Sequence, residues 1–228
     1  MARVQLEHVS KSFGQLNVLN DVSFSVEPGE FVSLIGPSGA GKSTLFNIIA
    51  GLDEPSSGHA LVDGSTAYMP QKDLLFPWRT ILDNTALGLD VQGVPKKQAR
   101  ERARELFAQF GLEGFEDALP FELSGGMRQR AALLRTVVQG KSTLLLDEPF
   151  GALDSITRNE LQTWLKGMWA DHDWTALLIT HDVREAVTLS DRVVVLSQRP
   201  ATVREIVEID PDADTAALEL RLLELLDL

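Results

Sequence analysis

Hydrophobic and polar residues follow different patterns in successive parts of the chain. Over residues 22–26, Val and Phe alternate with Ser, which is typical of a strand with one buried face. Residues 31–35 form a short, mainly apolar run that leads into a glycine-rich loop, and residues 42–50 then have a helical pattern that ends at Gly51. The first part of the chain therefore predicts strands followed by a strand–loop–helix unit.

The middle of the chain is helical in character. Residues 96–110 are rich in charge and carry apolar side chains on one side, at Ala99, Ala103, Leu106, Phe107 and Phe110. Residues 127–138 form a second helical stretch. We therefore predict a helical insertion over roughly residues 75–138.

Strands and helices alternate after residue 138. Apolar segments predict strands at residues 143–147, 175–180 and 193–196, and helical patterns fall between them at residues 155–170 and 182–189. Asp182 and Glu185 have the spacing of a capping box at the start of the second of these helices. Such alternation predicts a mainly parallel sheet covered by helices. The leucine-rich tail, residues 215–228, predicts a terminal helix docked on the core.

Composition narrows the possible partners. The 228 residues include 21 Lys and Arg against 33 Asp and Glu, a net charge of -12, which argues against a general nucleic-acid-binding surface. The absence of cysteine excludes disulfides, thiolate metal sites and cysteine nucleophiles. Apolar runs are far shorter than the about 20 residues of a membrane-spanning helix, and the N-terminus lacks the apolar core of a secretion signal. Any membrane role is therefore expected to come through a partner.

A glycine-rich loop supplies the first candidate chemistry. Residues 36–43 read Gly-Pro-Ser-Gly-Ala-Gly-Lys-Ser and fit the pattern of a phosphate-binding loop. Its glycines let successive N–H groups face an anion, and the helix that follows adds its positive end. In such a loop Lys42 reaches the β- and γ-phosphates and the Ser43 hydroxyl binds Mg²⁺. We expect the nucleotide to contact Gly36, Pro37, Ser38, Gly39, Ala40, Gly41, Lys42, Ser43 and Thr44.

Two acids provide a second site. The apolar residues 144–146 run directly into Asp147 and Glu148. At a strand end beside the phosphate loop, Asp147 is expected to hold Mg²⁺. Because side chains alternate along a strand, we expect Glu148 to point the other way, over the γ-phosphate, and to accept a proton from an attacking water.

Further motifs give the chain a resemblance to the ATPases of ATP-binding cassette (ABC) transporters. Residues 123–130, LSGGMRQR, resemble the signature motif, and residues 151–154, GALD, look like the D-loop. His181 ends a predicted strand where the family places its switch histidine, and Gln71 looks like the Q-loop glutamine. Phe13 lies at the position of the aromatic residue that stacks on adenine. These motifs occur in family order and cover nearly the whole chain.

The resemblance implies a fold class and a domain plan. The fold class is α/β, a P-loop NTPase core with a mainly parallel sheet, an N-terminal antiparallel β part and an inserted α-helical subdomain. A single ATPase domain spans residues 1–228. Within it, residues 1–74 and 139–228 form the nucleotide-binding core, and residues 75–138 form the helical signature subdomain.

The resemblance also implies ATP and Mg²⁺ as cofactors and a head-to-tail homodimer. The signature residues Ser124, Gly125 and Gly126 of one subunit close over the ATP of the other, and Asp154 belongs to the nucleotide-binding set. Glu148, His181 and Lys42 form the catalytic set, in which His181 contacts the γ-phosphate and orients Glu148 and the water. Ser43, Gln71 and Asp147 form the metal set, and Gln71 reports on the nucleotide to the helical region. Met127 replaces the usual Gln of the signature, without an expected loss of activity.

A segment after Gln71 suggests the partner. In transporter ATPases this region receives the coupling helix of the membrane subunit, so we expect a permease contact near Leu74–Arg79, with inward packing of Phe76 and Trp78 as the alternative. The residues of these motifs resemble those of importer subunits for nitrate, sulfonates and taurine, and for pyrimidine precursors of thiamine. The resemblance implies a peripheral subunit on the cytoplasmic face of the membrane, with permease subunits, an external solute-binding protein as indirect partner, and no nucleic acid.

Two other functions remain open at this point. A non-transport ABC ATPase acting on a soluble macromolecular assembly usually has a long coiled-coil insertion or two cassettes in one chain, and neither occurs here. A catalytically inactive interaction module would lack Lys42, Glu148 or His181, and all three are present.

Overall fold

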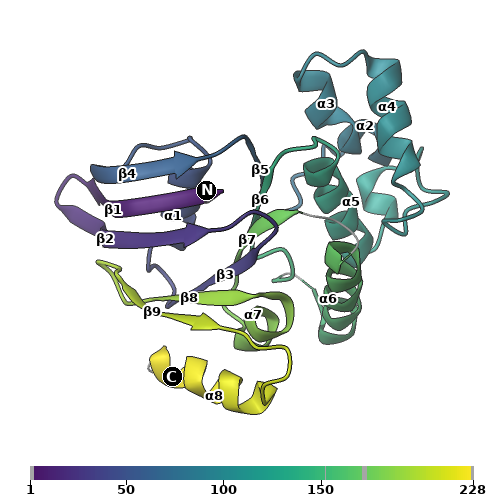
Figure 1. Cartoon of the computed structure of the whole chain (residues 1–228). Helices are drawn as coiled ribbons and strands as arrows, with labels where there is room; N and C mark the ends of the chain where they lie inside the picture. The colour runs from purple at the N-terminus through teal and green to yellow at the C-terminus, as the bar shows by residue number, and fades with distance from the viewer. Residues whose placement is uncertain (1–2, 152, 171–173, 227–228) are drawn as a thin grey trace.

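The computed structural model describes residues 3–151, 153–170 and 174–226. Its strands form two sheets (Figure 1). The antiparallel sheet has the order β2 (Leu16–Val26), β1 (Val4–Phe13) and β4 (Ser57–Val62). The larger sheet has the order β5 (Thr66–Met69), β6 (Thr143–Asp147), β7 (Thr175–Ile179), β3 (Phe31–Ile35), β8 (Arg192–Leu196) and β9 (Val203–Glu208). Neighbouring strands of the larger sheet are parallel except for β8 and β9. The predicted α/β class, mainly parallel sheet and N-terminal antiparallel part are confirmed.

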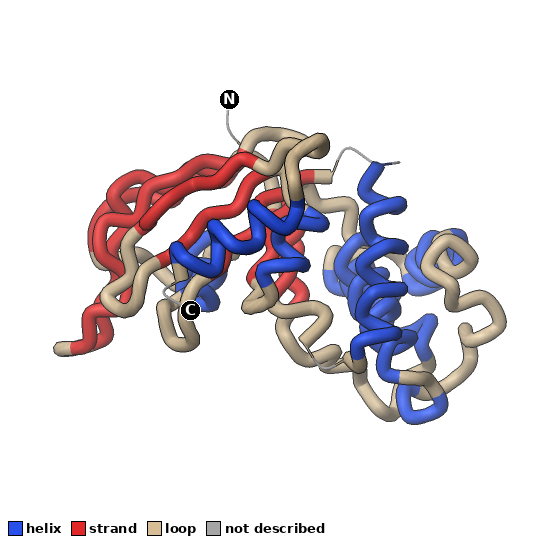
Figure 2. Tube along the Cα trace, turned by 90° about the horizontal axis from the view of Figure 1, so that it is seen from below, coloured by secondary structure: helices blue, strands red, loops and turns tan. Residues whose placement is uncertain are grey.

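The helices lie in two places. The core carries α1 (Lys42–Ile49), α6 (Ser155–Ala170), α7 (Val183–Leu189) and α8 (Thr215–Leu225). Between β5 and β6 the chain forms α2 (Ile81–Thr85), α3 (Leu87–Val91), α4 (Lys96–Glu105), the 3-10 helix η1 (Pro120–Glu122) and α5 (Gly125–Val137). Seen from below, the strands gather in one half of the molecule and a group of helices in the other (Figure 2).

One apolar core joins the two halves. It extends from Phe107, Phe110 and Leu134 of the helical part to Phe31 and Leu146 of the sheet, all almost fully buried. The subdomain boundaries expected at residues 74/75 and 138/139 remain a prediction, and this cluster of buried residues spans both of them. Among the described residues, no helix is both long and apolar enough to span a bilayer.

The helix predicted over residues 96–110 is shorter in the structure. It ends at Glu105, and the chain continues in tight turns in which the N–H groups of Leu106 and Phe107 donate to carbonyls three residues earlier. The predicted apolar side is nevertheless buried at Ala99, Ala103, Phe107 and Phe110. Periodicity identified the buried side but not the helix end, because tight turns retain a similar spacing of side chains.

The predicted capping box of α7 does not form. The Asp182 carboxylate accepts from the N–H of Arg184 at 2.9 Å, and the N–H of Asp182 donates to the Thr180 hydroxyl at 3.0 Å. Glu185 is buried and accepts hydrogen bonds from Gln162 and Thr180 instead. Spacing permits a capping box, but the tertiary partners of the glutamate decide whether it turns back to the helix start.

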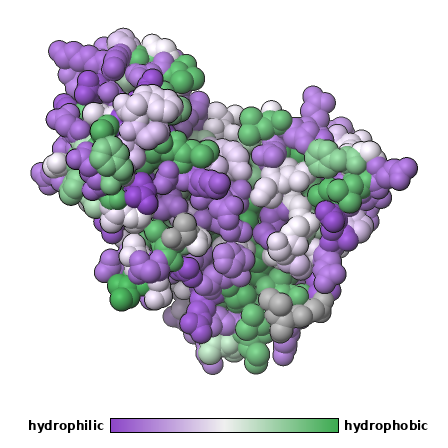
Figure 3. Space-filling view, turned by 180° about the vertical axis from the view of Figure 1, so that it is seen from behind, coloured by the Kyte–Doolittle hydropathy of each residue, from purple (hydrophilic) through white to green (hydrophobic). Residues whose placement is uncertain are grey.

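The C-terminal helix docks on the core, as predicted for the tail. Leu222 and Leu226 are buried against Ile35, Val187 and Val207. Residues 227–228 of the predicted tail helix lie outside the described residues. In the view from behind, hydrophobic residues gather at the lower end of the molecule, where α8 lies (Figure 3).

The buried aromatic contact between the helical part and α6 provides a test of this core. Phe110 is fully buried, and its ring centroid lies 5.1 Å from that of Trp164 in an edge-on arrangement. We expect Phe110→Ala to lower the free energy of unfolding by about 3–5 kcal/mol, because it leaves a cavity. Phe121, which is 74% exposed, is the matched control, and its replacement by Ala should cost less than about 0.5 kcal/mol. Equal effects in urea denaturation would show that Phe110 does not contribute to this core.

Candidate active site

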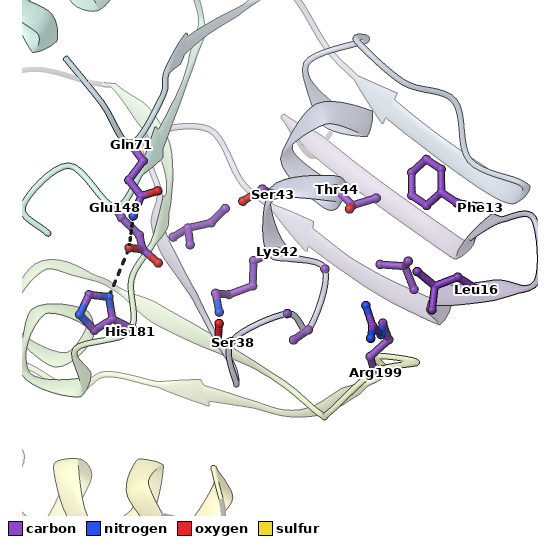
Figure 4. Close-up of a pocket in the computed structure, with 15 residues that line it drawn as sticks. Phe13, Leu16, Ser38, Lys42, Ser43, Thr44, Gln71, Glu148, His181 and Arg199 are labelled. Carbon is purple, nitrogen blue, oxygen red and sulfur yellow. Dashed lines mark hydrogen bonds and ion pairs between the residues drawn. The ribbon is translucent and has the colours of Figure 1, made fainter. Parts of the chain in front are cut away.

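A cleft of about 790 Å³ opens beside the phosphate-binding loop. Residues from β1, β2, the loop before α1, and the ends of β6, β7 and β8 line it (Figure 4). The lining residues are Phe13, Leu16, Val18, Ser38, Gly39, Ala40, Gly41, Lys42, Ser43, Thr44, Gln71, Glu148, Ile179, His181 and Arg199. Sequence positions more than 180 residues apart therefore meet at one surface.

The phosphate loop has its curved shape because of glycine. Gly41 has φ of 98°, a backbone conformation that favours glycine, and a Cβ added there would lie 2.6 Å from Cγ1 of Val18. α1 begins directly after it at Lys42. The loop is thus held against β2 in a conformation that no other residue type fits without strain, and the start of α1 directs its free N–H groups toward the cleft.

Lys42 is held by the loop itself. Its Nζ donates to the carbonyl oxygens of Gly36 at 2.7 Å and Pro37 at 3.1 Å. Burial lowers the pKa of Lys42, while the charges of Glu148 and Asp147 raise it. Gly36 and Pro37, which were expected to contact the nucleotide, do not line the cleft and contribute these carbonyls instead. The ammonium is therefore already positioned at the anion-binding loop.

Asp147 lies in a different environment from Glu148. Tyr68 donates its hydroxyl hydrogen bond to Oδ2 of Asp147 at 3.0 Å. Burial raises the pKa of Asp147, and hydrogen bonds from Tyr68 and Ser43 oppose that rise. Burial and the neighbouring Asp147 charge also raise the pKa of Tyr68. The phenol therefore stays a hydrogen-bond donor and fixes the carboxylate beside Ser43.

The donor set at this point fits Mg²⁺. The described residues contain no cluster of three or more His, Cys, Asp or Glu that could hold a metal. Ser43 and Asp147 instead offer one hydroxyl and one carboxylate beside a phosphate-binding loop. Mg²⁺ commonly takes one or two such protein oxygens and completes its shell with water and phosphate oxygens.

Glu148, Gln71 and His181 lie close together at the end of the cleft away from Phe13 and Leu16 (Figure 4). Gln71 Nε2 donates to Oε2 of Glu148 at 2.8 Å, and His181 Nδ1 lies 3.4 Å from the same oxygen. The side chains of Glu148 and Asp147 point in different directions, as expected, but strand alternation is not the reason. Glu148 follows the end of β6 and has φ of 45°, so the backbone turns there instead of continuing the strand alternation. Such strained conformations are concentrated at functional sites.

The segment after Gln71 is tied to the helix that carries the signature motif. Arg135 donates to the carbonyl oxygens of Asp73 at 2.5 Å and Leu74 at 2.9 Å. Arg128 Nε donates to Oδ2 of Asp73 at 3.3 Å, and its Nη1 donates to the carbonyl of Leu123 at 2.8 Å. These two arginines therefore fix the segment that follows Gln71 to α5.

The signature and D-loop residues lie together, away from the cleft of their own chain. Ser124 caps α5 by accepting the N–H of Met127 at 3.2 Å, and a Cβ on Gly126 would lie 2.5 Å from Cγ2 of Thr157. Asp154 caps α6 through hydrogen bonds from Ile156 and Thr157. Ser124, Gly125, Gly126 and Asp154 do not line the cleft. Ala152 of the expected D-loop lies outside the described residues.

A partly buried polar network joins the D-loop to residues 180–182, which include His181, and to Glu185 in α7. Arg158 donates to the carbonyl of Leu153 at 3.0 Å, and its guanidinium lies 3.6 Å from Asp182 and 3.8 Å from Glu185. Glu185 also accepts hydrogen bonds from Gln162 and Thr180, which flanks His181. Sequence reasoning missed this network because its only signal was the acid at position 185, which also fitted a helix cap.

Phe13 lies at the far end of the cleft from Glu148 (Figure 4). Its side chain is 50% exposed, and the Lys11 ammonium lies 4.9 Å from the ring centroid. Lys11 is itself held by Asp53 at 2.5 Å. The ring therefore has a cation at one face and open space in the cleft for a flat ligand group.

Several lining residues were not expected from the sequence. Leu16, Val18, Ile179 and Arg199 line the cleft, and Tyr68 supports Asp147 from behind it. Leu16 and Val18 belong to β2, one strand earlier than the strand that leads into the phosphate loop, and their alternation with Asn17 could have indicated one face of a strand. Arg199 lies more than 150 residues beyond the loop in the sequence, and nothing in its local pattern indicates a site.

Comparison with known proteins agrees with this geometry. Residues 19–151 match the family model described as ABC transporter. The chain belongs to the ABC transporter family. It is 47% identical to the aliphatic sulfonates import ATP-binding protein SsuB 1 of Rhodococcus jostii, over 87% of this chain and 81% of that protein. It is 44% identical to the formylaminopyrimidine import ATP-binding protein ThiZ of Halalkalibacterium halodurans, over 90% of this chain and 84% of that protein.

Solved structures of ABC cassettes have the same fold. The dimeric structure of the bacterial ABC transporter cassette MJ0796 superposes with a TM-score of 0.79 and 30% identity, covering 91% of this chain and 99% of that one. A post-hydrolysis dimer of that cassette, bound to ADP and Pi, gives a TM-score of 0.78 with the same identity and coverage. The chain is therefore an ABC ATPase that binds ATP, as predicted from its motifs.

Burial of Asp147 in this ABC ATPase predicts an unusual dependence of stability on pH. Its carboxyl has a raised pKa, so the folded state keeps the proton to higher pH than the unfolded chain. Stability from this group is present below the unfolded pKa and is lost as pH rises through the folded pKa. Asp147→Asn removes this loss and should stabilise the protein by about 0.5–2 kcal/mol at pH 7.

The comparison is made by urea denaturation at pH 7 and near pH 4. The gain from Asp147→Asn should shrink at the lower pH. Asp154→Asn is the control, and its effect on the pH dependence of stability should have the opposite sign, because hydrogen bonds from Thr157 lower the pKa of Asp154. Its contribution is present above the unfolded pKa and is lost as pH falls through the folded pKa. An Asp147→Asn protein that is less stable than the parent at pH 7 would contradict the prediction.

Proposed function

We propose that the chain is the ATP-hydrolysing subunit of an importer for a small anion or small organic solute. The observation that carries this proposal is the cleft in which the phosphate loop faces the Glu148–Gln71–His181 group. A phosphate-binding surface on one side and a carboxylate with two polar partners on the other are the parts that hydrolysis of a phosphate anhydride needs.

Each polar residue of the cleft has a role in this proposal. The amides of residues 38–44 bind the β- and γ-phosphates, and Lys42 supplies charge stabilisation. Glu148 accepts a proton from the attacking water, and His181 orients Glu148 and contacts the γ-phosphate. Gln71 joins Ser43 and Asp147 around the metal. Mg²⁺, when bound there, neutralises charge on the phosphate oxygens.

The second half of each site comes from a partner subunit. The signature residues Ser124, Gly125 and Gly126 and the D-loop residue Asp154 lie outside the cleft of their own chain. An isologous dimer of two such chains brings the signature of one over the nucleotide of the other and forms two equivalent sites. The dimeric cassette MJ0796, with the same fold at 30% identity, supports this arrangement.

The segment Leu74–Arg79 is the proposed permease contact. Trp78 is 74% exposed and Leu74 is 57% exposed. The segment is rigid, because the buried Asn84 side chain donates to the carbonyls of Phe76, Arg79 and Thr80. Phe76 packs against Trp78 with ring centroids 5.2 Å apart. An ordered, exposed aromatic residue beside Gln71 suits a protein partner that must sense the nucleotide.

The importer relatives extend the proposal to cargo and location. Their names refer to import of aliphatic sulfonates and of formylaminopyrimidine. We propose cargo of that type, nitrate, sulfonate, taurine or a pyrimidine precursor, delivered to the permease by an extracytoplasmic solute-binding protein. The ATPase itself would be peripheral on the cytoplasmic face of the membrane, acting without nucleic acid.

Glu148→Gln tests the catalytic assignment. The amide keeps the shape and the contact with Gln71 but cannot accept a proton, so we expect hydrolysis to fall by about 10²–10⁴-fold. ATP binding should persist, and the variant should form a dimer with ATP, measured by light scattering with and without nucleotide. Lys42→Ala is the comparison, since it should weaken nucleotide binding itself. Hydrolysis near the parental rate in Glu148→Gln would exclude Glu148 as the base.

Trp78→Ala tests the proposed permease contact. The variant should hydrolyse ATP at nearly the parental rate, because Trp78 does not line the cleft. When the tagged protein is recovered from detergent-solubilised membranes, we expect at least a tenfold loss of a co-purifying multi-span protein, since exposed aromatic anchors often contribute 2 kcal/mol or more. Phe121→Ala removes an equally exposed ring elsewhere and should have no effect. Unchanged recovery with Trp78→Ala would contradict the contact, and recovery of only soluble assemblies with the parent would contradict transport.

A further inference from the structure

Arg199 is the charged lining residue of the cleft that the proposed chemistry leaves without a role. It lies in the turn between β8 and β9 and lines the cleft with Phe13, Leu16 and Val18. In Figure 4 it lies on the side of Leu16 and Phe13, away from Glu148 and His181. A guanidinium in an anion-binding cleft is a candidate ligand contact, because its charge persists at all working pH values.

The backbone beneath Arg199 is fixed to the wall of the cleft. Ala201 is fully buried, its N–H donates to the carbonyl of Val18 at 2.9 Å, and its carbonyl accepts the N–H of Asn20 at 2.9 Å. Across the same turn, Thr202 N–H donates to the Ser197 hydroxyl at 2.9 Å, and Ser197 N–H donates to the Thr202 carbonyl at 3.0 Å. The turn is therefore part of the built cleft, and Arg199 emerges from it at a defined position.

The guanidinium of Arg199 has no partner in the described part of the chain, where it forms no hydrogen bond or ion pair. The other basic groups of the cleft are engaged, Lys42 by the carbonyls of Gly36 and Pro37 and His181 by Glu148. Glu148 is the acidic residue of the lining, and it lies on the far side (Figure 4). The chain has a net charge of -12, yet among residues 3–151, 153–170 and 174–226 no acidic group pairs with this cation.

The position of Arg199 along the cleft indicates which group of the nucleotide it contacts. The loop residues 38–44 hold the terminal phosphates in the proposed function, and Phe13 lies where a base would stack. Arg199 lies between these two ends, on the side of Leu16 (Figure 4). We infer that Arg199 binds the α-phosphate of the bound nucleotide, the group that ATP and ADP share, through charge-assisted hydrogen bonds. This inference rests on the proposed nucleotide site.

Titration calorimetry of ATP and ADP, with the full chain, tests this assignment. We expect Arg199→Gln to raise the Kd for both nucleotides by about tenfold and by similar factors, as fits loss of a hydrogen bond to a charged group. Arg199→Lys, which keeps the charge but loses the planar set of donors, should raise both Kd values by less than Arg199→Gln does. The dependence of Kd on salt should be weaker in Arg199→Gln than in the parent, because one charge no longer contributes.

Two control variants make the result decisive. Arg102→Gln makes the same change of net charge on an exposed position of α4 and should bind both nucleotides like the parent. Lys42→Ala should weaken binding through the phosphate loop. Parental Kd values in Arg199→Gln, or a loss confined to ATP, would overturn the α-phosphate contact. If Lys42→Ala weakens binding and Arg199→Gln does not, the proposed function stands and this inference falls; if the parent itself binds neither nucleotide, the proposed function falls.

Discussion

Parallel pairing of β6, β7 and β3 is the constraint on which the rest of the structure depends. In this register Asp147 lies opposite Ile179, and Leu34 lies opposite Ile179 on the other side. The carboxyl ends of the three strands consequently reach one edge of the sheet, where the phosphate loop, the acids and His181 follow them directly. A shift of one residue in either pairing would turn these segments away from each other.

From that edge, polar contacts extend in two directions. Gln71 joins Glu148 to the segment that Arg128 and Arg135 fix to α5. On the other side, Arg158 joins the D-loop carbonyl of Leu153 to buried Glu185 in α7. Both routes are built around arginine side chains that hold backbone carbonyls or carboxylates, and the neutral Gln71 links the first route to Glu148. Under the proposed function, such connections carry a change at the γ-phosphate to surfaces that contact other chains.

The electrostatics of the cleft oppose those of the whole protein. The chain is strongly acidic, yet its cleft presents Lys42 and Arg199 to an incoming anion. Asp147 and Glu185 are buried near it, and burial raises the pKa of both carboxyls. Burying acids in this way lowers stability at neutral pH, and both carboxylates accept hydrogen bonds there, Asp147 from Tyr68 and Glu185 from Gln162 and Thr180. Under the proposed function, the metal-binding role of Asp147 is the reason to keep a destabilising acid at that position.

The sequence by itself determined the α/β class, the order of the main strands, the phosphate loop and the identity of the acids, because each depends on short-range patterns. Loop glycines, an apolar strand ending in Asp147 and Glu148, and helical periodicity can all be identified within about ten residues. The tertiary structure decided what no local pattern contains. It set the early end of α4, the inward turn of Glu185, the support of Asp147 by Tyr68, and the arrival of Arg199 in the cleft. The last three depend on residues distant in sequence, Gln162 for Glu185, Tyr68 for Asp147 and the strands β1 and β2 for Arg199, and only the packed sheets bring such residues together.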